Sequence, residues 1–517
     1  MGKEAVPGER SFFLNNKELI TNMSASLISY VITLGISFVL SPYLVENVGV
    51  EAYGFVGLAN NFVSYAALAT IALNSLAGRF VTVKIYEDNM YEANIYFSSV
   101  FISNLLIAST LGIIGTFSVV FLEKLIAIPE GLYWDVKILF SLLFINCLIS
   151  TIDSVFAIST FATNKLYINS IRQIEANILK VIILLPLFLF LKPRILYLGV
   201  ATLIMGMYIF LFDIYYKRKL LPDIHIKLGY FRIKAVIQLV SSGVWNLIVR
   251  IGQLLLDGLD LLIANIFINA ASMGILSLAK IVPAAITGVV GNMVSVFSPN
   301  FTILYAQKEN DKLIKAVKQS IKIMGIIANI PIIILIICGR RFYALWQPTQ
   351  DESQLYILSI LTCMGLIFNG GINCLYDIFT VVNKLKWNAI GLCITGAVST
   401  FVVYVLLKTT DLGLIAVAGT SSILAIIRNL VFTVPYAAYC LKLKWYTFYP
   451  DVIKPIIFVS ISSFIGLVIE RHFDVRTWFG LVIMGVISFV IAVIVGGGII
   501  LNRDDRRMFA DKIKGRL

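Results

Sequence analysis

Long apolar segments recur along almost the whole chain, separated by short polar connections. A helix that crosses a bilayer needs about 20 mostly apolar residues, and runs of that length recur from Ile20 almost to the C-terminus. The pattern predicts an all-α membrane protein with about fourteen transmembrane helices. We place them at residues 20–45, 52–76, 94–122, 136–161, 175–191, 195–216, 236–267, 274–304, 321–338, 355–382, 387–407, 412–440, 455–469 and 478–501.

The apolar pattern repeats along the chain with a nearly constant shift. LVENVGVEAYGFVGLANNF, which begins at Leu44, aligns with ANIFINAASMGILSLAKIV, which begins at Ala264, at a shift of 220 residues. NKLYIN, which begins at Asn164, aligns with NKLKWN, which begins at Asn383, at a shift of 219 residues. Spans one to six and seven to twelve are therefore expected to form two related six-helix lobes. Because six is even, both lobes enter the membrane in the same sense, and their symmetry axis runs along the membrane normal.

The repeat also divides the chain. We expect an N-terminal lobe at residues 1–216 and a cytoplasmic linker between the lobes at 217–235. A C-terminal lobe is expected at 236–440, and residues 441–517 add helices 13 and 14 and a cytoplasmic tail. The last two helices fall outside the repeat, so they are an addition to a core of two lobes.

Composition and charge place the loops. The 517 residues are 59% hydrophobic and 14% charged, with a formal net charge of +13, and the mean hydropathy is +0.90. When alternate loops are assigned to opposite sides, about 30 of the Lys and Arg residues lie on the side that holds both termini and about 8 on the other. We therefore expect both termini in the cytoplasm. The basic loops are a topology signal and a contact for anionic membrane lipids, so no nucleic-acid partner is expected.

Polar residues inside the predicted spans are the candidate functional groups. Span seven carries a stripe within roughly 80° of helical arc, formed by Ser242, Asn246, Arg250, Gln253, Asp257 and Asp260. Other spans contain Asp153, Lys280, Asn369, Asn373, Asp377 and Arg428. An ionised side chain at the bilayer centre is costly, so the charged members must face protein, water or one another. Two explanations remain open: a water-filled cavity between the lobes, or polar bonds between neighbouring helices.

The sequence lacks the motifs of several classes of enzyme and of metal-binding proteins. The chain contains no GxxxxGK[ST] phosphate loop and no long soluble segment that would hydrolyse nucleotides. The six cysteines lie in or at the ends of apolar runs, and both histidines, His225 and His472, lie in connecting segments. No disulfide, metal site or other cofactor is expected, and a transporter driven by an ion gradient or by removal of its substrate is favoured over an enzyme.

The chain resembles the polysaccharide and O-antigen lipid flippases. The resemblance rests on the long first span, on VGVEAYG in the segment Leu44–Asn61, on Arg79 after span two, and on MGILSLAKIVPAAITGVVGNMVSVFSPNF from Met273. These flippases belong to the multidrug/oligosaccharidyl-lipid/polysaccharide exporter superfamily, which also holds multidrug extruders and lipid II flippases. The likeness covers essentially the whole chain. Multidrug extruders typically have twelve spans and saccharide-lipid flippases typically have fourteen, so the extra pair favours a flippase.

This resemblance implies a monomeric transporter of the bacterial cytoplasmic membrane. Its substrate would be an undecaprenyl-pyrophosphate-linked oligosaccharide for capsule, O-antigen or exopolysaccharide, flipped to the outer leaflet by ion-coupled alternating access. The polymerase and glycosyltransferases of the same pathway would be its partners. A lipid II flippase ranks second, because that branch is known for cavity arginines in its first two spans and here only Arg79 follows span two. A multidrug or cation antiporter and a membrane-embedded glycan transferase rank below it.

The resemblance suggests a role for each class of polar residue. Cations neutralise a buried pyrophosphate. Arg250 and Lys280 are the first candidates, and Arg79 and Arg428 come next. Amides suit sugar hydroxyls, and the candidates are Asn246, Gln253, Asn60, Asn369 and Asn373. Membrane carboxylates couple a proton or a sodium ion, and the candidates are Asp257, Asp260, Asp153 and Asp377.

Overall fold

The protein is built from α-helices with short 3₁₀ and π-helical segments. The computed structural model describes residues 7–294, 297–473 and 475–502, and it contains no β-strand among them. Thirteen of the described helices are long and apolar enough to cross a membrane, or fourteen if the bent pair Ala270–Ala279 and Ile281–Val294 is one span. The fourteen spans expected from hydropathy are therefore confirmed. The chain divides into two compact units, residues 1–250 and 251–517.

The first unit contains six candidate spans. Its helices are α1 (Pro7–Val48), α2 (Val50–Asn74), α3 (Ala77–Tyr86), α4 (Met90–Val120), α5 (Leu122–Leu125), α6 (Tyr133–Phe156), α7 (Ile158–Ala162), α8 (Leu166–Phe190) and α9 (Leu196–Leu220), with 3₁₀ turns η1 (Glu130–Leu132) and η2 (Leu228–Tyr230). The pairs α2–α3 and α6–α7 each form one candidate span. The boundary between the units falls inside α10 (Ile233–Gln253).

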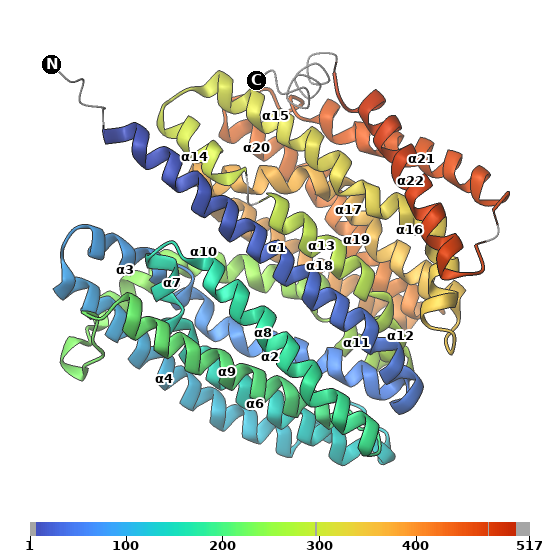
Figure 1. Ribbon diagram of the computed structural model, residues 1–517. Helices are drawn as coiled ribbons and strands as arrows, with labels where there is room; N and C mark the ends of the chain where they lie inside the picture. The colour runs from blue at the N-terminus through green and yellow to red at the C-terminus, as the bar shows by residue number, and fades with distance from the viewer. Residues whose placement is uncertain (1–6, 295–296, 474, 503–517) are drawn as a thin grey trace. The chain divides into compact units, whose positions relative to one another are not determined.

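Helix α6 lies at the centre of the first unit. It packs against α2, α4 and α9, while α8 packs against both α1 and α9 (Figure 1). At one end of these helices a hydrophobic core contains the fully buried Val81, Phe97, Val155 and Leu239. Ile224, from the connection after α9, is also fully buried there. The long loop before α10 is thus held in place by burial of its own apolar side chains.

The second unit repeats the first and then extends it. After the π-helical turn η3 (Leu254–Gly258) come α11 (Asp260–Phe267), α12 (Ala270–Ala279), α13 (Ile281–Val294), α14 (Ser298–Ala306), α15 (Asn310–Ile327), α16 (Asn329–Trp346), α17 (Glu352–Val381), α18 (Leu385–Thr409), α19 (Leu414–Arg428), a second π-helical turn η4 (Asn429–Thr433), α20 (Val434–Cys440), α21 (Tyr449–Glu470) and α22 (Trp478–Ile499). Helix α17 occupies the place of α6, because it packs against α13, α15 and α19.

Turn conformations confirm the repeat residue by residue. Asn164 and Asn383, which align at a shift of 219, have φ values of 55° and 54°. Asp88 and Lys308, which align at a shift of 220, have φ values of 56° and 59°. These left-handed residues follow the C-terminal ends of equivalent helices, where such a residue satisfies the last carbonyl groups. The two units therefore share helix order, internal packing and turn geometry.

The last two helices lie outside the repeat. Helices α21 and α22 pack against each other, and both pack against α16 (Figure 1). Their contact buries Phe458, Met484 and Ala492 against Ile333 of α16. The C-terminal pair is therefore part of the second unit's own core, as expected for two spans added to a six-helix lobe.

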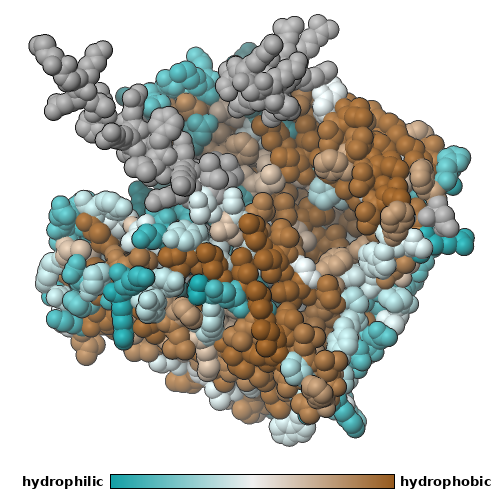
Figure 2. All heavy atoms as spheres, viewed as in Figure 1, coloured by the Kyte–Doolittle hydropathy of each residue, from teal (hydrophilic) through white to brown (hydrophobic). Residues whose placement is uncertain are grey.

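The outer surface is apolar, as a bilayer requires. Val39, Ile113, Leu189 and Phe190 are more than two-thirds exposed, and all lie on long helices. On the face drawn in Figure 2, apolar residues form broad areas and hydrophilic residues gather at the end of the first unit where α3 and α7 lie. In a membrane these apolar side chains face lipid, so their exposure costs nothing.

Helix eight of the predicted series is broken. We expected one span at 274–304, but α12 and α13 are bent by 40°, and α14 is a separate helix. Pro283 explains the break, because it has no N–H to donate to the carbonyl of Ala279. The buried hydroxyl of Ser359 donates to that carbonyl instead, at 2.7 Å. The bend is therefore stabilised by a side chain of α17.

Candidate functional site

A π-helical turn interrupts the polar stripe of span seven. Helix α10 ends at Gln253 and η3 follows it. A Cβ atom added to Gly396 of α18 would lie 2.6 Å from the carbonyl oxygen of Gly252. Two glycines thus let the backbones meet, as small residues do at membrane helix crossings. The hydroxyl of Thr400 donates to the carbonyl of Leu255 at 2.8 Å, so α18 satisfies a polar group of the turn.

The π-helical turn corrects the predicted geometry of the stripe. The spacing predicts one wet face running from Ser242 to Asp260, because it assumes 100° per residue throughout. A π-helical turn changes that phase. Asp257 is exposed, whereas Asp260 is only 4% exposed. The two carboxylates therefore lie in different surroundings, and the prediction of a single continuous face is wrong.

Asp260 forms an ion pair with Lys280, one of the residues predicted to bind the pyrophosphate. Lys280 Nζ lies 2.5 Å from Asp260 Oδ2 and donates to the carbonyl oxygen of Asp257 at 3.0 Å. Lys280 follows α12 at the bend, so the break in that helix and the π-helical turn place these two charges together. Within the described residues, the charge of Lys280 is therefore balanced by the buried carboxylate of Asp260.

Arg428 has different surroundings. It ends α19, immediately before η4, and is 9% exposed. Its guanidinium donates to the Tyr376 hydroxyl and, at 2.8 Å from Nη2, to Asn429 Oδ1. The buried Nη1 has no hydrogen-bond partner. No described carboxylate lies within ion-pair distance of this cation, which is thus held entirely by neutral groups.

Asn429 organises this network, which we call the Arg428 cluster: Arg428, Asn429, Tyr376, Asn369 and Thr433. Besides Arg428, Asn429 Oδ1 accepts from the Tyr376 hydroxyl at 2.7 Å and from the Thr433 hydroxyl at 2.9 Å. Its amide donates to Asn369 Oδ1. The π-helical turn η4 begins at Asn429, so both π-helical turns of the second unit adjoin candidate polar residues. Such turns are frequent at functional sites.

The remaining second-unit candidates lie on α17. Asn373 and Asp377 are both half-buried. Asp377 Oδ2 is buried without a hydrogen-bond partner. Asn373 and Asp377 are therefore partly accessible polar groups of the same helix that contributes Asn369 and Tyr376 to the Arg428 cluster.

The candidates before the unit boundary are more open. Arg79, at the start of α3, and Asn60, on α2, are exposed. The Asn60 amide donates to the Val56 carbonyl of its own helix at 2.9 Å. On α10, Asn246 is half-buried and Arg250 is exposed. Gln253, beyond the boundary at the end of α10, is also exposed.

Asp153 has an acidic partner that the sequence did not reveal. It lies on α6, and its carboxyl group hydrogen-bonds to that of Asp213 on the neighbouring α9. Asp213 is 4% exposed. Two carboxyl groups share a hydrogen bond only when one of them carries a proton, because both ionised forms are acceptors. The signal in the sequence was a lone aspartate in the apolar run FLFDIYY, which we did not count among the candidates.

Comparisons with known proteins place this fold. A family model described as polysaccharide biosynthesis protein matches residues 19–305. The uncharacterized membrane protein EpsK of Bacillus subtilis (strain 168) is 24% identical over 473 residues, which cover 91% of this chain and 94% of EpsK.

Two solved structures share the architecture. The lipid II flippase MurJ, in an inward closed conformation, has a TM-score of 0.69 at 16% identity and covers 92% of this chain and 98% of its own. An inward-facing multidrug resistance MATE family transporter of the MOP superfamily has a TM-score of 0.66 at 16% identity, covering 82% of this chain and 98% of its own. This chain therefore shares the fold of these two membrane proteins. With its family model matching more than half of the sequence, the chain belongs to the polysaccharide biosynthesis protein family.

Proposed function

We propose that this protein flips undecaprenyl-pyrophosphate-linked oligosaccharide repeat units from the cytoplasmic to the outer leaflet of the bacterial cytoplasmic membrane, with both termini in the cytoplasm. The units would serve capsule, O-antigen or exopolysaccharide synthesis, and the pathway's polymerase and glycosyltransferases would be its partners. Membership of the family and the fold of MOP-superfamily transporters support a saccharide-related transporter. Alternating access between the two lobes would carry the substrate.

The observation that carries this proposal is the uncompensated charge of Arg428. A guanidinium inside a membrane protein is costly unless an anion or a full set of acceptors surrounds it. Arg428 has neutral acceptors and one unpartnered buried nitrogen, Nη1. A pyrophosphate supplies the missing negative charge, and a guanidinium binds phosphate oxygens in a bidentate manner. We therefore rank Arg428 first among the phosphate ligands, with Arg250 and Arg79 as accessible cations and Lys280 after them.

The amide groups nearby suit the saccharide. Asn369 belongs to the Arg428 cluster, and Asn373 lies one turn further along α17. In the proposed mechanism, sugar hydroxyls exchange hydrogen bonds with these amides, and Asn246, Gln253 and Asn60 contribute from other helices. Each hydrogen bond of this kind contributes only about 0.6 kcal/mol in a membrane protein. The sugar contacts would therefore determine specificity, and the phosphate contacts would supply most of the binding affinity.

The driving force in this proposal is a proton or a sodium ion. Asp153 is the candidate that the geometry favours for a proton, because its hydrogen bond to Asp213 requires one. Asp260 is occupied by Lys280, while Asp257 and Asp377 remain candidates for a sodium ion.

Reconstituted transport tests the proposal. The protein is placed in proteoliposomes with a fluorescent saccharide-pyrophosphoryl-polyprenol, and movement is read as exposure to a membrane-impermeant quencher. We expect Arg428→Gln to slow translocation at least tenfold and Arg428→Lys to retain part of it. Arg471→Gln changes an exposed arginine beyond α21 by the same charge and is expected to behave as wild type.

Each alternative function has its own outcome. Unchanged translocation in Arg428→Gln would remove the phosphate role of that residue. Movement of lipid II in place of the saccharide-lipid would make the protein a lipid II flippase. Export of cationic drugs would make it an antiporter, and a chemically altered product without leaflet movement would make it a glycan transferase.

A further inference from the structure

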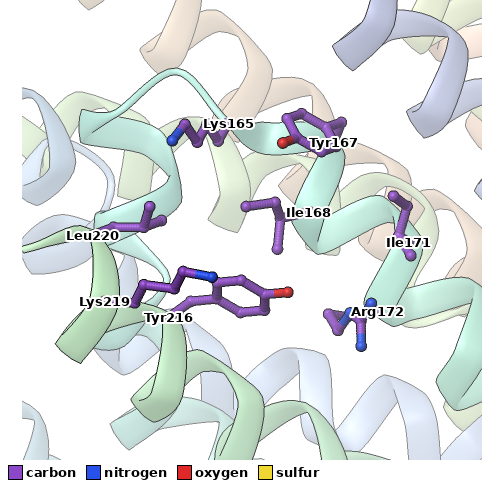
Figure 3. A pocket seen from close by; sticks show the side chains of 8 residues that line it. All are labelled: Lys165, Tyr167, Ile168, Ile171, Arg172, Tyr216, Lys219 and Leu220. Carbon is purple, nitrogen blue, oxygen red and sulfur yellow. The ribbon is translucent and has the colours of Figure 1, made fainter.

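A cationic pocket opens in the first unit, and none of the residues that line it has been assigned a role above. It has a volume of about 240 Å³ and lies between the start of α8 and the end of α9. Its lining includes three basic residues, Lys165, Arg172 and Lys219, and two tyrosines, Tyr167 and Tyr216. Figure 3 shows these side chains around one hollow, with the Tyr216 hydroxyl turned toward Arg172. None of the lining residues is acidic.

Arg172 is fixed in the wall of the pocket. Its Nη1 lies 2.6 Å from Glu175 Oε2, and its guanidinium carbon lies 4.9 Å from the centre of the Phe212 ring. Tyr208 donates to the same Glu175 carboxylate. Arg172 Nε, however, is buried and has no hydrogen-bond partner. One donor of a preorganised guanidinium is thus unsatisfied in a wall of the pocket, and Lys165 and Lys219 add two further positive charges.

At the equivalent place in the second unit, aromatic side chains pack where the first unit has the pocket. At the shifts of the repeat, Arg172 and Phe212 align with Gly391 and Phe432. The Phe432 ring packs so closely on Gly391 that an added Cβ would lie 3.2 Å from it. Lys384, which aligns with Lys165, lies 5.2 Å from the centre of the Tyr439 ring. The same scaffold therefore holds aromatic packing in one unit and an open cationic pocket in the other.

The pocket is continuous with an apolar stripe on α8. Ile171 lines the pocket, and it begins a series of exposed apolar residues spaced by 7, 4, 3 and 4 positions, which places them on one face of the helix. The series is Ile171, Ile178, Ile182, Leu185 and Leu189, each at least 38% exposed. A ligand that joins a phosphate to a hydrocarbon chain fits both features, whereas a soluble anion uses only the first.

We propose that this pocket binds the headgroup phosphate of an anionic membrane phospholipid, with an acyl chain along the exposed face of α8. Basic pockets between helices at the membrane surface are suited to such headgroups. The volume is many times the roughly 10–15 Å³ that a single water needs, so it accommodates a phosphate group. By the charge of the loops, Lys165 and Lys219 lie on the side that holds both termini. This site is separate from the proposed substrate residues and does not depend on which saccharide is carried.

The test compares lipids that differ only in headgroup. Full-length protein in neutral detergent is titrated with phosphatidylglycerol or phosphatidylcholine of identical acyl chains, and bound lipid is counted by native mass spectrometry. We expect tighter binding of phosphatidylglycerol, weakened about fivefold by Lys165→Gln or by Lys219→Gln and more by both together. Arg218→Gln removes a charge from the neighbouring exposed residue that does not line the pocket, and it should retain wild-type affinity.

The outcomes separate lipid from free anion. The proposal is overturned if the double variant binds phosphatidylglycerol as tightly as wild type, or if Arg218→Gln weakens binding equally. It is also overturned if inorganic phosphate or pyrophosphate binds with the same dependence on Lys165 and Lys219 while the two lipids bind alike, because the site would then take a soluble anion. Because Lys165 and Lys219 lie at the surface ends of their helices, equal unfolding temperatures in phosphatidylcholine verify that the variants fold.

Discussion

Lys280, at the bend between α12 and α13, neutralises Asp260 at the start of α11, with 2.5 Å between Nζ and Oδ2. Asp260 is 4% exposed, so removal of the lysine leaves a buried carboxylate without its cation. We expect Lys280→Met to lower the free energy of unfolding by about 3 kcal/mol. The measurement is unfolding in detergent.

A double variant separates this charge effect from packing. Lys280→Met combined with Asp260→Asn removes both charges and is expected to recover most of the lost stability. If the double variant is as unstable as the sum of the two single variants, Lys280 and Asp260 are not coupled and the ion pair does not stabilise the bend.

Gly252 and Gly396 let the backbones of α10 and α18 approach closely beside the π-helical turn η3. A Cβ at position 396 would meet the Gly252 carbonyl oxygen at 2.6 Å, a backbone atom that cannot turn aside. Gly396→Ala should therefore cost about 1–3 kcal/mol. The matched control is Gly485→Ala on α22, where nothing lies within 4 Å of the new methyl group. That change should be neutral or stabilise by up to about 1 kcal/mol, and equal losses at both positions would contradict the crossing.

The left-handed conformation of Asn383 predicts that glycine is tolerated at this position better than valine. Its φ of 54° suits asparagine and glycine and disfavours a β-branched residue. Asn383→Val should destabilise by about 1–2 kcal/mol, while Asn383→Gly stays within a few tenths. Thermal unfolding measures both. A valine variant as stable as wild type would show that this turn relaxes to another conformation at no cost.

The paired carboxyl groups of Asp153 and Asp213 predict an effect on coupling. Asp213→Asn replaces the carboxyl group that lies beside that of Asp153. We expect translocation that no longer accelerates when a proton gradient is imposed on proteoliposomes. Asp223→Asn, in the exposed loop after α9, is the control. A proton dependence unchanged in Asp213→Asn would place the coupling site elsewhere, and a sodium dependence would favour Asp257 or Asp377.

Glu123 predicts a pH effect at the loop between α4 and α6. Lys137 Nζ lies 2.7 Å from its carboxylate, and this contact lowers the pKa of Glu123 below its ordinary value of 4.5. A carboxylate with a lowered pKa contributes stability above its ordinary pKa, and that contribution disappears as pH falls through the pKa in the folded protein. Wild type should lose its stability advantage over Glu123→Gln below about pH 4.5. Glu130→Gln, at an exposed neighbouring glutamate, should show no such pH-dependent difference.

Local sequence determined the spans and the repeat. The number of spans follows from hydropathy, because an apolar run of bilayer length has one stable state in lipid. The alignment of NKLYIN with NKLKWN predicted equivalent turns, and Asn164 and Asn383 share one backbone conformation. These features depend on residues close together in the chain, which is why the sequence alone was sufficient.

Tertiary structure decided the ionic contacts and the interruptions of the helices. The partners Asp153 and Asp213, like Tyr376 and Arg428, are more than fifty residues apart, so no periodicity links them. The π-helical turn that contains Asp257 and precedes Asp260 accepts a hydrogen bond from Thr400 of another helix. A hydrophobic pattern says which residues face lipid, but whether a buried charge finds an anion depends on which helices pack beside it. For that reason Lys280 and Arg428, which look alike in sequence as lone cations in apolar runs, have opposite surroundings in the fold.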